Sequence, residues 1–326
     1  MQPNFPPRTS LAHLPTPLEP LERLSRFLDG PEIWVKRDDQ TGLAGGGNKT
    51  RKLEFLVQDA IEQGCDHLIT MGGPQSNHCR QTAAAAAKMG MGCSLVFRGD
   101  APTNRNGNQL LDQLLGAHLY WAGSRPRPEV AAEVAKEQTI LGKKPYIVPL
   151  GGSNVVGSTG YVFAMRELQQ QITHQRLNFD FIIMPSSSGG TQAGITLGAE
   201  VYNIRSRILG ISIDVPAEQL RLQVSALATA TSTHLGLGML PVAKRVEVND
   251  DYIEPGYGVV TDMEREAIML MAQKEGILLD PVYTGRAMGG LVDLIRWGAF
   301  TRRQRILFWH TGGMPALFAY QQQLLR

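Results

Sequence analysis

Short apolar stretches alternate with helix-forming stretches along most of this chain, and this alternation limits the folds that it can adopt. Strand-like segments at 67–71, 93–97 and 180–184 are each followed by a segment with helical character. The run Ala83–Ala87 has the highest helix propensity available and belongs to one of those helices. Strands separated by helices pair in parallel, with helices on both faces of the sheet. The pattern therefore predicts an α/β fold.

A glycine-rich stretch, Gly151–Gly160, interrupts the alternation and divides it into two series. Before the first series, the proline-rich first thirty residues predict an irregular arm. Two α/β series without a linker predict two closely packed domains with a ligand-binding cleft between them. The expected strands are 33–36, 67–71, 93–97, 118–121, 145–149, 180–184, 207–213, 246–248 and 305–309. The expected helices are 21–28, 52–63, 78–89, 107–115, 128–141, 161–173, 191–203, 216–230, 261–275, 284–297 and 314–325.

Charge balance and cysteine content argue against several classes of protein. The chain has 32 Lys and Arg against 30 Asp and Glu, with no long run of one sign, so we expect neither a nucleic-acid nor a membrane partner. No apolar run approaches the roughly 20 residues that cross a bilayer. The three cysteines form no CxxC pair and no signal-peptide segment begins the chain, which indicates a cytoplasmic protein. The seven histidines are scattered, so we expect no metal.

The first of three glycine-rich turns, Gly42–Thr50, contains Lys49 at the start of an expected helix. It nearly matches a nucleotide-binding P-loop, but Asn48 separates the second glycine from the lysine, and the preceding segment is charged instead of apolar. Lys49 is alternatively a covalent catalyst. Neighbouring Arg51 and Lys52, together with burial, would lower the pKa of its amine and favour the nucleophilic form. A solvated lysine at a helix start is the other interpretation.

The second turn, Gly72–His78, joins an apolar strand to the alanine-rich helix. Ser76 or Asn77 can cap this helix through a side-chain oxygen. The unpaired N–H groups of a helix start also bind anions, so the turn is suited to a carboxylate. Capping alone is the simpler interpretation of this turn taken by itself.

The third turn, Ser186–Gly194, leaves the apolar strand Phe181–Met184 and opens another helix. Its small residues let a ligand approach the backbone, and several N–H groups and hydroxyls converge there. This combination is typical of a phosphate-binding loop. The turn lacks the lysine of a P-loop and the spacing of a dinucleotide-binding loop.

Together the three turns provide a phosphate site, a carboxylate site and an activated lysine. An enzyme that uses pyridoxal 5'-phosphate (PLP) on an amino acid needs these three parts. A serine hydrolase is not indicated, because the chain has no G-x-S-x-G motif. We therefore expect a PLP enzyme with a small amino acid as its substrate.

Six segments then show a resemblance to a known family. In chain order they are Gly46–Leu56, Gln75–His78, Ser188–Gly194, Tyr257–Gly258, Asp280–Gly285 and His310–Gly313. Together they resemble the family of 1-aminocyclopropane-1-carboxylate (ACC) deaminase and D-cysteine desulfhydrase. The resemblance extends from about residue 14 to residue 320, nearly the whole chain.

The resemblance implies the tryptophan-synthase-β-like PLP fold, called fold type II, and a homodimer. The domains expected from it are a large PLP-binding domain of residues 1–51 and 162–326 and a small domain of residues 52–161. Lys49 corresponds to the residue that binds the cofactor covalently, and Asn77 to the one that contacts its ring oxygen. The implied phosphate loop is Ser188, Gly189, Gly190 and Thr191. The implied substrate-binding residues are Ser76, Asn77, His78, Tyr257, Tyr283 and Thr284. The implied catalytic residues are Lys49, Tyr257, Tyr283 and Ser76.

Two positions separate the branches of this family. ACC deaminases have Glu after the second tyrosine and Leu in the His-x-Gly-Gly motif, whereas this chain has Thr284 and Thr311, as D-cysteine desulfhydrases do. A carboxylate near the pyridine nitrogen would strengthen the electron sink, and an elimination with a good leaving group needs this less. The expected activity is therefore conversion of D-cysteine to pyruvate, sulfide and ammonia, with Thr311 among the cofactor-binding residues. L-cysteate sulfo-lyase and ACC deaminase are the alternatives.

Overall fold

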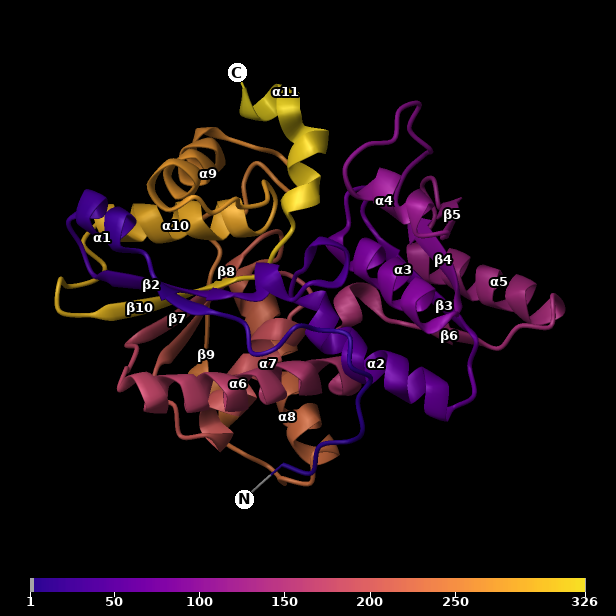
Figure 1. Ribbon diagram of the computed structural model, residues 1–326, viewed down its shortest axis with the longest axis horizontal. Coiled ribbons are helices and arrows are strands. Elements are labelled where there is room, and N and C mark those ends of the chain that lie inside the picture. The colour runs from indigo at the N-terminus through magenta and orange to yellow at the C-terminus, as the bar shows by residue number, and fades with distance from the viewer. Residues whose placement is uncertain (1–2, 326) are drawn as a thin grey trace.

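The computed structural model describes residues 3–325 and arranges the strands in two sheets (Figure 1). The larger sheet has the order β1-β2-β10-β7-β8-β9, in which only β1 is antiparallel to its neighbour. The smaller sheet has the order β5-β4-β3-β6 and is parallel throughout. The strands are β1 (Leu18–Pro20), β2 (Glu32–Arg37), β3 (His67–Gly72), β4 (Gly92–Phe97), β5 (His118–Trp121), β6 (Pro145–Ile147), β7 (Phe181–Ser186), β8 (Arg207–Ser212), β9 (Val246–Asn249) and β10 (Arg305–His310).

Helices cover both faces of each sheet. They are α1 (Glu22–Leu28), α2 (Lys49–Glu62), α3 (Asn77–Met89), α4 (Asn108–Leu114), α5 (Arg127–Ile140), α6 (Val155–Gln175), α7 (Gly190–Val201), α8 (Ala217–His234), α9 (Asp262–Glu275), α10 (Thr284–Arg296) and α11 (Gln321–Leu324). On β10, Ile306 and Phe308 pack with α1, α9 and α10, whereas Leu307 and Trp309 pack with α6 and α7. This alternation follows from the two-residue period of a strand.

The smaller sheet is covered in the same way, by α2 and α3 on one face and α5 on the other. Leu68 and Leu95 face α2 and α3, and their neighbours Ile69 and Val96 face α5. Helix α2 also packs against α6, which belongs to the larger unit, so α2 joins the two units (Figure 1). The two sheets support a division into 1–51 with 162–326 and 52–161, and these boundaries remain a prediction.

The helix expected at 161–173 begins earlier, at Val155, and includes part of the glycine-rich stretch. Asn154 caps it by accepting a hydrogen bond from the N–H of Gly157 at 2.9 Å. The glycines here do not form a loop but let the helix pack closely against α2. A Cβ on Gly160 would lie 2.2 Å from the carbonyl oxygen of Arg51. The expected helix start at residue 161 was wrong, because glycine normally weakens a helix and the preceding stretch is rich in glycine.

Two terminal segments also differ from expectation. The segment expected as one helix at 314–325 is a 3-10 helix, Met314–Tyr320, followed by the short α11. The irregular arm contains the three-residue strand β1, which pairs with β2 at the edge of the larger sheet. Pro20 ends this strand, and a sheet edge tolerates a residue that lacks an N–H.

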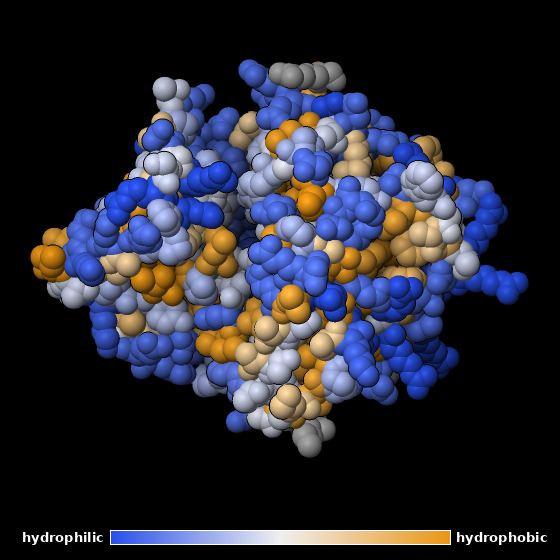
Figure 2. Space-filling model, turned by 180° about the vertical axis from the view of Figure 1, so that it is seen from behind, coloured by the Kyte–Doolittle hydropathy of each residue, from blue (hydrophilic) through white to orange (hydrophobic). Residues whose placement is uncertain are grey.

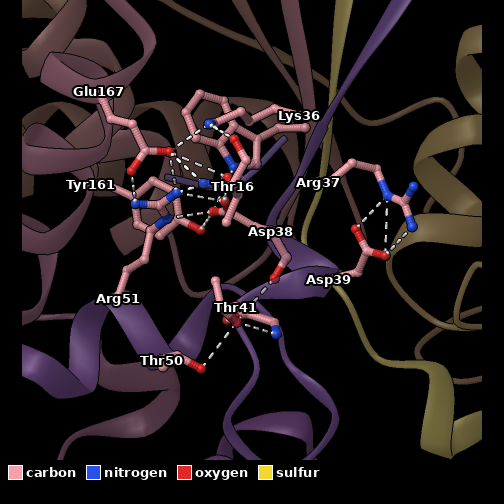
Figure 3. A network of polar contacts seen from close by, with 12 residues as sticks. Thr16, Lys36, Arg37, Asp38, Asp39, Thr41, Thr50, Arg51, Tyr161 and Glu167 are labelled. Atoms are coloured by element: carbon pink, nitrogen blue, oxygen red, sulfur yellow. Dashed lines mark hydrogen bonds and ion pairs between the residues drawn. The ribbon is translucent and has the colours of Figure 1, made fainter. Parts of the chain in front are cut away.

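A buried ionic network fixes the first turn of α2 (Figure 3). The guanidinium of Arg51 donates two hydrogen bonds of 2.9 Å to the carboxylate of Asp38 and bonds of 2.9 and 3.1 Å to that of Glu167. Asp38 also accepts from Tyr161 on α6 and Trp309 on β10, at 2.6 and 2.8 Å. Although burial opposes ionisation, Arg51 keeps the pKa of Asp38 below its usual value. The network therefore joins α2, α6 and two strands of the larger sheet through charges that water does not screen.

Replacing Arg51 by Met should strongly destabilise the fold. The substitution leaves the buried carboxylate of Asp38 without its ion-pair partner, while Glu167 keeps Lys36. Loss of one partner of a buried pair typically costs about 3–5 kcal/mol. The free energy of unfolding, measured by denaturant titration, checks this. Arg296→Met provides the control, because its ion pair with Glu266 lies on the surface and should contribute less than about 1 kcal/mol. Equal effects of the two substitutions would contradict the structural role of the network.

Candidate active site

A cavity of about 520 Å³ lies where the carboxyl ends of strands from both sheets meet. Its walls come from the segments that follow β3, β4, β7, β8 and β10, together with the start of α2. Ligands bind at this position in open α/β sheets, because the carboxyl ends of parallel strands expose loops and helix starts there. Seen from behind, the surface is hollowed between the two lobes (Figure 2). All three glycine-rich turns contribute lining residues to this cavity.

Lys49 is the first residue of α2, and its side chain borders the cavity. Its Nζ donates to no acceptor within residues 3–325. Burial lowers the pKa of this amine to about 8, so a larger fraction of it is uncharged near neutral pH than of an ordinary lysine. Burial is the one cause of this shift, so neither Arg51 nor Lys52 lowers the pKa of Lys49 as expected. The guanidinium of Arg51 points into the ionic network of Asp38 and Glu167.

The expected phosphate loop lies at the amino end of α7. Ser188, Gly189 and Thr191 line the cavity, and Gly190 lies behind them as the first residue of the helix. The first N–H groups of a helix lack intrahelical partners and attract anions. A Cβ on Gly151 would lie 2.4 Å from Ser188 Oγ and 3.5 Å from Lys49 Nζ, so this glycine lets the lysine and the loop approach each other.

Three residues outside the predicted set complete this loop. Ser153 Oγ donates to Ser188 Oγ at 2.9 Å and accepts from the N–H of Gly190 at 3.2 Å. Asn48 Nδ2 donates to Thr191 Oγ1 at 2.9 Å. The amine of Lys52, held by Gly151 O and Ser153 Oγ, would lie 2.7 Å from a Cβ on Gly190. Lys52 is three residues after Lys49, a helical spacing that was available in the sequence as a signal.

The turn Gly72–His78 forms the opposite wall of the cavity. Ser76 caps α3 by accepting from the N–H of Cys79 at 3.2 Å, and both Ser76 and Asn77 line the cavity. The hydroxyl of Thr70 donates to Val148 O, so at 2.9 Å it must accept from Nε2 of His78. Burial, then the nearby Lys49 and Lys52, lower the pKa of His78 well below its usual value. A neutral ring with this tautomer leaves only the backbone N–H of His78 for an anion.

The two predicted tyrosines meet over the cavity. Their hydroxyls, on Tyr257 and Tyr283, form a hydrogen bond of 2.7 Å. Burial raises the pKa of both phenols above the usual value, so both stay protonated at neutral pH. A protonated pair of this kind can pass a proton to a group that leaves with a negative charge.

The two threonines that distinguish the branches lie in different surroundings. Thr311 lines the cavity, directly after β10. Thr284 is fully buried outside the lining, and its hydroxyl donates to Asp280 Oδ1 at 2.7 Å. Thr284 is therefore not brought together with the other predicted site residues, although it lies next to Tyr283.

The sequence matches the family model described as "Pyridoxal-phosphate dependent enzyme" over residues 9–312. The chain belongs to this family. A D-cysteine desulfhydrase of Salmonella newport is 42% identical to it over 320 residues, which cover 96% of each chain. A D-cysteine desulfhydrase of Yersinia pestis is 43% identical over 324 residues, covering 98% of this chain and 97% of the relative.

Solved structures give the same fold. A crystal structure of an ACC deaminase homologue has a TM-score of 0.89 and 38% identity, and the match covers 98% of this chain and 95% of the other. A fungal L-serine ammonia-lyase from Rhizomucor miehei has a TM-score of 0.68 at 19% identity, which concerns the fold alone. The predicted family, the fold of type II and the dependence on PLP are therefore confirmed.

The residues around the cavity fit pyridoxal phosphate. Lys49 offers an amine of lowered pKa for the aldehyde. The helix start at Gly190 and the amine of Lys52 offer hydrogen-bond donors for the phosphate. Burial, then the nearby Lys49, lower the pKa of Lys52 well below its usual value. When bound, the cofactor supplies an electron sink for the pair of electrons left on a substrate carbon. Three or more side chains that could share a metal ion do not gather anywhere in the part of the chain that the structure describes.

Replacing Lys49 by Ala should abolish the visible absorption band of lysine-bound cofactor and all turnover, because no other amine borders the cavity without a partner among residues 3–325. Lys52→Ala is the matched variant. It should keep the band and weaken PLP binding by about tenfold, since it loses one hydrogen-bond donor beside the phosphate. Titration of each purified variant with PLP, followed by absorbance, measures both effects. A normal band in Lys49→Ala would contradict the assignment.

Proposed function

We propose that the chain is a lyase that converts D-cysteine and water to pyruvate, ammonia and hydrogen sulfide. The observation that supports this most directly is the position of the Lys49 amine, between the phosphate loop and the Gly72–His78 turn, in a chain 42% identical to D-cysteine desulfhydrases. In the proposed reaction the Cα–H and Cβ–S bonds break, and sulfur leaves with the Cβ–S electron pair. The remaining three-carbon unit takes up water and loses ammonia, so atoms balance.

Different residues of the cavity have different roles in this reaction. The backbone N–H groups and hydroxyl at Ser76–His78 bind the substrate carboxylate at the start of α3. Lys49, when released from the cofactor, removes the Cα proton, because a pKa of about 8 suits a base near neutral pH. The paired hydroxyls of Tyr257 and Tyr283 supply a proton to the leaving sulfur. Ser76 contributes to carboxylate binding in this scheme.

ACC deaminase is a less suitable function for this chain. Ring opening of ACC expels a carbon group, which needs a stronger electron sink than the expulsion of sulfide. The position that carries Glu in that branch carries Thr284 here, whose hydroxyl donates to Asp280 outside the cavity lining and supplies no carboxylate to a protonated pyridine nitrogen. The position that carries Leu in that branch carries Thr311. An elimination of sulfide is compatible with this weaker support.

L-cysteate is a second candidate substrate, favoured by two arginines. Arg98 and Arg127 line the cavity, and their guanidiniums form no hydrogen bond or ion pair with residues 3–325. The backbone N–H of Arg98 donates to Gly72 O at 3.1 Å, which places this residue beside the carboxylate-binding turn. Arg127 begins α5, where the helix dipole disfavours a cation. Two unpaired cations on the substrate side suit a sulfonate at the β-carbon.

The resemblance to the family also supports a homodimer in the cytoplasm. All three cysteines are unpaired, as in a reducing compartment. No helix between residues 3 and 325 has the length and apolar character needed to cross a membrane.

A parallel assay of pyruvate release tests the proposed reaction. D-cysteine should give the highest kcat/KM among D-cysteine, L-cysteine, L-cysteate and β-chloroalanine, with sulfide released in equal amount. ACC should give no 2-oxobutyrate. A PLP-loaded protein that releases no pyruvate from any of the four compounds would contradict the proposal.

The arginine variants distinguish the two substrates in the same assay. Arg98→Gln and Arg127→Gln should lower kcat/KM for L-cysteate about tenfold or more, because a lost charged hydrogen bond weakens binding by this order. Neutral β-chloroalanine should be affected much less. Equal losses for both compounds would show that the arginines do not select an anionic β-substituent.

A further inference from the structure

We propose that Asn108 is a positioning residue, which holds the side-chain amide of Asn77 so that its two N–H bonds point toward the cofactor. The inference rests on the proposed contact of Asn77 with the cofactor and is independent of which amino acid is the substrate. Asn108 is the first residue of α4 and is fully buried. It lies outside the cavity lining, whereas Asn77 lies on it.

The orientation of the Asn108 amide is fixed by partners that allow only one choice. Its Oδ1 accepts from Nη1 of Arg80 at 3.0 Å, and a guanidinium can only donate. Its Nδ2 donates to the carbonyl oxygen of Gln75 at 2.9 Å, and a carbonyl can only accept. Exchanging the oxygen and nitrogen of this amide would therefore lose both bonds.

This orientation determines that of Asn77. The second N–H of Asn108 Nδ2 points to the Asn77 side chain, 2.8 Å away, so the atom that it meets must be the acceptor Oδ1. The Nδ2 group of Asn77 is then directed away from Asn108. It donates to no acceptor in the described chain, and it lies close to Gly313, where a Cβ would approach it to 2.6 Å.

Asn77 therefore presents donors, and no acceptor, at the junction of α3 and the His310–Gly313 turn. A ligand atom that uses them must be an acceptor, as the ring oxygen of pyridoxal phosphate is when it is deprotonated. Without Asn108 the amide of Asn77 could rotate by half a turn and present its oxygen instead. Asn108 thus determines that Asn77 offers a ligand a hydrogen-bond donor and not an acceptor.

The backbone around Asn108 also supports the turn that carries Asn77. Gln75 Oε1 accepts from the N–H of Asn108 at 2.8 Å, and Gln75 Nε2 donates to Asn106 O at 3.1 Å. Arg80, which holds Asn108, also donates at 2.8 Å to Gly46 O in the loop before Lys49. Asn108 is thereby linked to both the Asn77 turn and the Lys49 loop.

Asn108→Asp tests the inference, because it keeps the shape and the bond from Arg80 but removes the donor. The carboxylate would turn the Asn77 amide around, and the cofactor's ring oxygen would face an acceptor. An oxygen without a donor binds a proton more tightly, so the pH midpoint of the visible band of the loaded enzyme should rise. PLP binding should weaken by about tenfold.

A double-mutant cycle separates positioning from general damage. In an Asn77→Ala background, Asn108→Asp should cause no further shift of the midpoint. Gln109→Glu makes the same amide-to-carboxylate change at the next buried residue of α4 and should leave the midpoint unchanged. Asn108→Ala removes the donor without adding a charge, should raise the midpoint in the same direction, and serves if the Asp variant does not fold.

The possible results distinguish this inference from the proposed function. A wild-type band with an unchanged midpoint in both Asn108 variants would overturn the inference alone. An equal shift in the Asn77→Ala background would also overturn it, because Asn108 would then act by another route. A wild-type protein that forms no visible band with PLP would instead contradict the proposed function itself.

Discussion

The buried ion pairs of Arg51 are the constraint on which the site depends. Separating a buried guanidinium from two largely buried carboxylates is costly, so the ion pairs oppose movement of the first turn of α2 relative to Asp38 and Glu167. That turn also contains Lys49 and Lys52. The network therefore holds one amine at the cavity and the other beside the phosphate loop, although neither lysine belongs to the network. Because Glu167 is on α6, the same contact ties the joining helix α2 to the larger sheet.

Most of the fold could be predicted from the sequence, because strand and helix periods are local properties. Strands such as β3 and β4 and helices such as α3 lie within a few residues of their expected ranges. The early start of α6 could not be predicted, since Gly160 is there for close contact with Arg51, which lies far away in the sequence. The strand β1 was missed for a similar reason: a three-residue strand is defined by its partner and has no period of its own.

Part of the site could likewise be predicted from the sequence, and part of it could not. The two turns and Lys49, which the structure brings to one cavity, could be picked out because each is a short motif at a helix start. Ser153 and Asn48 were missed because their roles depend on residues 35 and 143 positions away. The direction of Arg51 was missed because the helix was expected from residue 52, whereas α2 begins at Lys49 and residues two apart on a helix point to opposite sides. Asn108 shows the same limit: no local pattern marks a buried amide that orients another one.

Locating the covalent bond to the cofactor tests the central claim most directly. Reduction of the PLP-loaded protein with borohydride fixes the cofactor on the amine that holds it, and mass spectrometry of the peptides then identifies that residue. The account predicts a single phosphopyridoxyl group on Lys49, whose amine meets no acceptor in residues 3–325, and none on Lys52, which is held by Gly151 and Ser153. Modification of Lys52 in its place, or of no residue in this segment, would contradict it.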